Sequence, residues 1–75
     1  MPEPTAVVIH TDTISLDAFL KWSGIADTGG TAKQLVRSGR VLVNGLAEIH
    51  PGRKLVEGDV IALGGTAWRV SREAR

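Results

Sequence analysis

The first part of the chain shows the spacing of an amphipathic helix. Three apolar residues recur at positions i, i+3 and i+4: Leu16, Phe19 and Leu20. This spacing places them on one face of a helix. Ser15 is a preferred N-cap residue, and Asp17 falls in the first turn, where the helix dipole favours a carboxylate. Gly24 is suited to end the helix. The pattern therefore predicts a helix here, preceded by an edge strand over residues 6–10, which are rich in β-branched side chains.

A second apolar stripe follows a short linker. It consists of Ala32, Leu35 and Val36. The stripe predicts a helix from about Thr31 to Ser38, and Gly39 supplies its end. Thr31 and Gln34 have the spacing of a capping box, in which each side chain satisfies a backbone donor, whereas Thr28 is the alternative N-cap.

From residue 40 onward the pattern becomes that of short strands separated by turns. Asn44-Gly45 tolerates the positive φ angles of a type I′ turn, which predicts a hairpin between residues 41–43 and 46–49. Further turn signals are Pro51-Gly52, Glu57-Gly58-Asp59 and Gly64-Gly65. The last of these predicts a second hairpin between residues 60–63 and 66–70. We therefore expect an α+β fold in which two short helices pack on a small, mostly antiparallel sheet.

The length and composition set limits on the protein as a whole. A chain of 75 residues has room for one domain, which we assign to residues 6–71 between loose tails at 1–5 and 72–75. Without cysteine, neither disulfides nor thiolate metal ligands can reinforce the fold. No apolar run approaches the ~20 residues that a membrane span needs. We therefore expect a monomeric, cytoplasmic protein that uses no metal and no cofactor.

Positive charge is concentrated in the middle of the chain. Residues 28–56 contain five basic side chains: Lys33, Arg37, Arg40, Arg53 and Lys54. Glu48 is the one acid there, so this window carries +4 and leaves −3 for the rest of a chain with a total of +1. Lys33 and Arg37 are four residues apart and share one helical face. Such asymmetry indicates a polyanionic partner, although a solvated charged face gives the same pattern.

Residues that could carry chemistry are few. Neither His10 nor His50 has a nucleophile or an orienting acid at a recognisable spacing, and two histidines without cysteine do not make a zinc site. Asp59 follows a turn glycine, where a carboxylate most often caps backbone N–H groups. The sequence therefore predicts a protein without catalytic activity.

The aromatic residues offer little surface for stacking bases. Phe19 and Trp68 are expected in the core, while Trp22 is ambiguous and is expected to pack against the sheet. If the polyanion is RNA, it is therefore structured RNA that is recognised by its shape and backbone.

The ordered set of signals resembles the S4-type RNA-binding domain, which carries the alpha-L motif. The landmarks are Leu16-Asp17-x-x-Leu20, Gly24, Ala32-x-x-Leu35-Val36, Gly39, Val41-x-Val43-Asn44-Gly45 and Gly58-Asp59-x-Ile61. Three segments resemble the compact stand-alone bacterial branch of this family (YaaA/YbcJ-like): Lys21-Trp22, Thr28-Gly29-Gly30 and Gly52-Arg53-Lys54. The resemblance covers about two thirds of the chain.

This resemblance implies binding of ribosomal or transfer RNA, and possible association with the ribosome, through the second helix and the adjoining hairpin. The positions that match are Lys33, Gln34, Arg37, Arg40, Asn44, Arg53 and Lys54. Many members begin the second helix with Ser-Arg, where this chain has Thr28-Gly29, so one phosphate-binding arginine is missing. Gly29 and Gly30 offer bare backbone N–H groups at the helix start in its place.

Besides DNA as the bound polyanion, since a phosphate-binding patch does not itself sense the 2′-hydroxyl, two alternatives remain open at this point. The chain could be a protein-interaction adaptor that keeps the fold without binding RNA, an alternative that the missing arginine favours. Arg37 and Arg40 could also serve the fold alone, by capping the helix end and pairing with Glu48.

Overall fold

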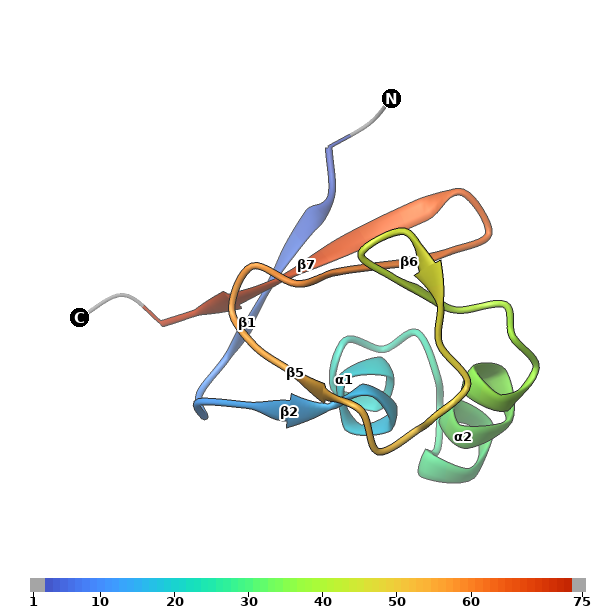
Figure 1. Ribbon diagram of the computed structural model, residues 1–75. Helices are drawn as coiled ribbons and strands as arrows, with labels where there is room; N and C mark the ends of the chain where they lie inside the picture. Colours follow the sequence, from blue (N-terminus) through green and yellow to red (C-terminus); the bar gives the residue numbers. More distant parts are fainter. Residues whose placement is uncertain (1–2, 74–75) are drawn as a thin grey trace.

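Two helices and two β-sheets make up the protein in the computed structural model, which describes residues 3–73 (Figure 1). The elements in chain order are β1 (Thr5–Ile9), β2 (Ile14–Ser15), α1 (Leu16–Trp22), α2 (Gly29–Arg37), β3 (Leu42–Val43), β4 (Leu46–Ala47), β5 (Lys54–Leu55), β6 (Val60–Leu63) and β7 (Thr66–Arg72). The larger sheet has the order β1-β7-β6-β3-β4, and β2 pairs with β5 in the smaller one. The predicted α+β class is confirmed.

The larger sheet is mixed. β1 lies at its edge and runs parallel to β7, with Thr5 opposite Trp68 and Ile9 opposite Arg72, whereas the remaining pairs are antiparallel. The edge strand expected from the sequence is confirmed. Strands begin at Thr5 and end at Arg72, so each predicted tail loses one residue to the sheet. Residues 1–2 and 74–75 of those tails lie outside the described part of the chain.

The hairpin between β3 and β4 has the predicted tight turn. Asn44 and Gly45 have φ angles of 52° and 86°, and left-handed backbone at both central positions defines a type I′ turn. The Asn44 side chain also ties this turn to β6. Its Oδ1 accepts a hydrogen bond from Val60 N (2.9 Å), and its Nδ2 donates to Asp59 Oδ1 (3.1 Å). Asp59 Oδ2 in turn accepts from Val56 N, which confirms the predicted capping role of this carboxylate.

α2 begins earlier than the apolar stripe indicates. Its N-cap is Thr28, whose backbone is extended and whose Oγ1 accepts a hydrogen bond from Thr31 N (3.1 Å). The helix therefore starts at Gly29, and the capping box of Thr31 and Gln34 is wrong, while the alternative cap is right. A threonine cap contributes about 1 kcal/mol, which offsets part of the cost of the two glycines in the first turn.

The buried core lies between the helices and the sheet. Its members are Ile9, Leu16, Phe19, Leu20, Ala26, Ala32, Val36, Val41, Val43, Leu55, Ile61 and Val70. Within the predicted stripe of α2, Ala32 and Val36 are fully buried, but Leu35 packs at the edge of the core and remains partly exposed. Trp68 is also partly buried against the core. The prediction that Trp68 lies in the core is therefore confirmed in part.

Trp22 lies at the surface. Its side chain is 57% exposed, and its Nε1 donates to the Val8 carbonyl of β1 (2.9 Å). The ring is therefore fixed against the edge of the sheet without being buried in the core.

Candidate nucleic-acid interface

The outer face of α2 carries three of the predicted RNA-binding residues. Lys33, Gln34 and Arg37 are exposed, on the side of the helix opposite Ala32 and Val36. Side chains three and four residues apart are neighbours on a helix, so these three form one polar strip. The sequence pattern predicted this grouping, and the structure confirms that the strip faces solvent.

Arg40 extends this strip beyond the end of the helix. Gly39 turns the chain with a φ of 79°, a conformation that glycine adopts without steric cost. Arg40 follows and is exposed, and Val41 then enters the core. Neither Arg37 nor Arg40 forms an ion pair within 4.0 Å in residues 3–73. The alternative in which they pair with Glu48 is therefore not what the structure shows.

Glu48 instead holds the turn that follows β4. Its Oε1 accepts a hydrogen bond from Arg53 Nη1 (2.9 Å), and its Oε2 accepts from His50 N (3.1 Å) and lies 2.8 Å from His50 Nδ1. The bond from Arg53 is the main cause that lowers the pKa of Glu48 to about 2, and the bonds from His50 add to it. Arg53 is thus partly neutralised, unlike the cations of α2.

The same turn caps the start of α1. Leu16 N donates to the Arg53 carbonyl (2.8 Å), and Asp17 N donates to the Pro51 carbonyl (3.0 Å). Ser15 occupies the N-cap as predicted, but its side chain makes no capping hydrogen bond to the helix backbone. The carbonyls of a distant turn therefore bind two of the free N–H groups of this helix.

Asp17 connects the turn to α2. A hydrogen bond from Ser15 is the main cause that lowers the pKa of the Asp17 carboxyl, and the positive charge of Lys33 contributes to the same shift. Lys33 therefore lies within electrostatic reach of Asp17, whose backbone contacts the turn. Lys54 is exposed on β5, opposite Ser15 of β2. Lys33 of α2 and Lys54 of β5 thus lie near the start of α1.

Asn44 differs from the other predicted residues. Both polar atoms of its side chain are used inside the fold, by Val60 and Asp59, although the side chain lies in an exposed turn.

The role of Glu48 as the anchor of Arg53 was not predicted from the sequence. The one signal in the sequence was its position as a single acid among five bases.

Residues 3–73 contain no group of three or more histidine, cysteine or acidic side chains placed to hold a metal ion. Within the same range, no helix combines the length and the apolar character needed to cross a membrane.

Comparisons with known proteins agree with the fold. The family model described as the S4 domain matches residues 7–71. A protein of Bacillus subtilis (strain 168) named "Probable ribosome maturation protein RlbA" is 39% identical over 59 residues, which cover 79% of this chain and 83% of that protein.

Proposed function

Because the chain belongs to the S4 domain family, we propose that it binds structured RNA, ribosomal or transfer RNA, without catalysing a reaction. We define the cation surface as Lys33, Arg37, Arg40, Arg53 and Lys54. The observation that carries the proposal is that four of these, all except Arg53, are exposed and form no ion pair within residues 3–73. Gln34 lies between them as a neutral hydrogen-bonding group.

The arrangement suits a phosphate backbone. Arg37 and Arg40 can each bind a phosphate with two parallel hydrogen bonds, whereas Lys33 and Lys54 act as point charges. A cation that is already paired must give up its partner before it binds a phosphate, so Arg53 contributes less than the others. Asn44 supports the site by holding the hairpin, since its polar atoms are engaged inside the fold.

The name of the Bacillus subtilis relative favours ribosomal RNA over transfer RNA as the target. On this proposal the chain acts as a monomer in the cytoplasm, and it binds the RNA of a ribosomal particle that is still maturing. A single small domain with one polar face is sufficient for such a role.

Salt dependence tests the proposal. If about four cations meet phosphates, log K for structured ribosomal RNA falls with log salt at a slope of roughly −3, because each contact contributes about 0.7–0.9. Arg37→Glu and Arg40→Glu each weaken binding with little change in melting temperature, since exposed charges add little stability. Glu3→Arg is the control for net charge and changes the affinity far less. Binding of both reversals as tight as that of the wild type would favour the adaptor alternative.

A further inference from the structure

The exposed Trp22 of α1 is held in a fixed position. Its indole Nε1 donates to the Val8 carbonyl, and the His10 ring stands edge-on to it with ring centroids 6.0 Å apart and planes at 86°. Because the indole occupies this carbonyl of the edge strand, Val8 is less available to pair with a strand of another protein. A partner at this position can instead insert a side chain beside the ring.

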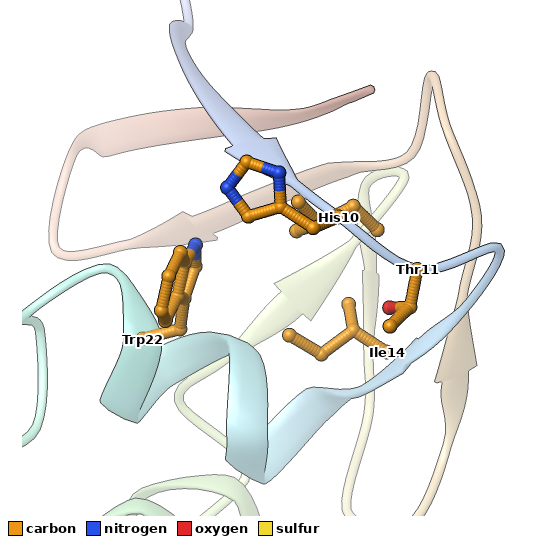
Figure 2. Close-up of a pocket in the computed structure, with 5 residues that line it drawn as sticks. His10, Thr11, Ile14 and Trp22 are labelled. Atoms are coloured by element: carbon orange, nitrogen blue, oxygen red, sulfur yellow. The ribbon is translucent and has the colours of Figure 1, made fainter. Parts of the chain in front are cut away.

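Two adjoining hollows flank the Trp22 ring. The first, of about 190 Å³, is lined by Ile9, His10, Thr11, Ile14 and Trp22 (Figure 2). The second, of about 410 Å³, is lined by Ile14, Ala18, Lys21 and Trp22. Ile14 and Trp22 line both, so the hollows adjoin, and we call the two together the Trp22 groove.

The Trp22 groove and the cation surface share no residue. Ala18 and Trp22 are four residues apart on one flank of α1, and Lys21, which also lines the groove, lies four residues after Asp17 on the other flank. A molecule bound by the cation surface therefore contacts other residues than those that line the groove.

The chemistry of the groove favours a polypeptide over RNA. The lining of the first hollow is almost entirely apolar and that of the second is mostly apolar, so the polar edges of a nucleobase would find few partners. Lys21 lies at one end. At the other end Glu73, 71% exposed, contacts His10 at 3.0 Å, and Asp12 pairs with Arg72. At this end Glu73 would repel a phosphate and attract a basic side chain, whereas Lys21 would attract an acidic group at the other end, so the two ends suit a segment that carries both signs of charge.

We propose that the Trp22 groove docks a segment of a protein within the particle whose RNA the cation surface binds; the choice of particle rests on the proposed function. The segment places an apolar side chain against Trp22. A lysine or arginine on one side of this anchor faces Glu73, and an aspartate or glutamate on the other side faces Lys21. The chain thus bridges RNA and protein through two separate sets of residues of one small fold.

Site-specific crosslinking tests this bridge, and the absence of cysteine makes single labels simple. Ala18→Cys and Gln34→Cys are each coupled to benzophenone maleimide and irradiated with purified bacterial ribosomal particles that include precursor subunits. The label at position 18 forms an adduct with a ribosomal protein, at a peptide in which an apolar residue lies between a base and an acid. The label at position 34 forms an adduct with RNA.

Variants in the labelled background separate docking from folding. In the Ala18→Cys variant, Trp22→Ser lowers the yield of protein adduct about tenfold, as expected for the loss of a central aromatic anchor. In the Gln34→Cys variant, Trp22→Ser leaves the RNA adduct unchanged. Glu73→Lys lowers the protein adduct several-fold and provides the test if Trp22→Ser does not fold.

The outcomes that overturn the docking site are distinct from failure of RNA binding. An RNA adduct at position 18, an adduct with a second copy of the chain, or no adduct there each refutes the groove proposal. Loss of the RNA adduct at position 34 refutes the proposed function instead, because that label reports only on α2.

Discussion

Gly29→Arg should increase RNA affinity, because it supplies a cation at the first position of α2. The structure has room for the side chain: a Cβ built on Gly29 meets no atom within 4 Å, and the φ angle lies outside the left-handed region. Gly29 begins the helix that carries Lys33 and Arg37, so the new arginine extends the same polar strip.

The size of the effect follows from counterion release. One further phosphate contact steepens the salt dependence by about 0.7–0.9, which corresponds to about four- to sixfold higher affinity at 0.15 M salt. Stability should change little. Replacing a helical glycine gains up to about 1 kcal/mol, while a cation at a helix N-terminus costs about 0.3–1 kcal/mol.

The assay is a fluorescence titration of labelled ribosomal RNA at several salt concentrations, with melting temperatures measured in parallel. Thr66→Arg adds the same charge at an exposed position on the β6–β7 hairpin (Figure 1) and serves as the matched control. If Gly29→Arg binds no better than Thr66→Arg, with an unchanged salt slope, the start of α2 does not face the RNA and the reasoning fails.

Three other perturbations test the fold. Leu20→Ala removes a fully buried side chain and should cost about 2–5 kcal/mol in urea unfolding, whereas Leu35→Ala should cost clearly less because Leu35 is partly exposed; equal costs would contradict the core described above. Asn44→Val combined with Gly45→Val should abolish folding, because β-branched residues resist positive φ, and dispersed amide NMR signals from this double variant would refute the tight hairpin. The pKa of Glu48 is lowered in the folded protein to about 2, so its stabilising effect is present above the unfolded pKa and lost as pH falls from about 4.5 to about 2. Glu48→Gln should therefore flatten the plot of melting temperature against pH in this window, and an unchanged plot would show that the carboxylate does not anchor Arg53.

Much of the candidate site could be read from the sequence because its geometry is local. Lys33, Gln34 and Arg37 share a face whenever the segment is helical, and the buried positions Ala32 and Val36 decide which face points outward. Which cations remain unpaired could not be read in this way. The separations along the chain from Glu48 to Arg53 and from Glu48 to Arg40 differ by only a few residues, so they do not identify its partner. The path of the turn brings Glu48 to Arg53.

The sequence by itself determined the elements whose cause lies within a few residues. The two helices, the Asn44-Gly45 hairpin, the Gly64-Gly65 hairpin and the capping carboxylate of Asp59 all depend on local periodicity, turn conformation or short-range hydrogen bonds. The family resemblance rested on the order of these same local signals.

Only the tertiary structure decided the contacts between segments distant in the chain. β1 pairs in parallel with β7, carbonyls of Pro51 and Arg53 cap α1, and Trp22 is fixed by a carbonyl of the edge strand. These contacts form because buried apolar side chains bring the segments together, and the backbone groups left without partners then bond to whichever donor or acceptor lies opposite. The sequence marks each group as a donor or an acceptor, and packing of the core selects its partner.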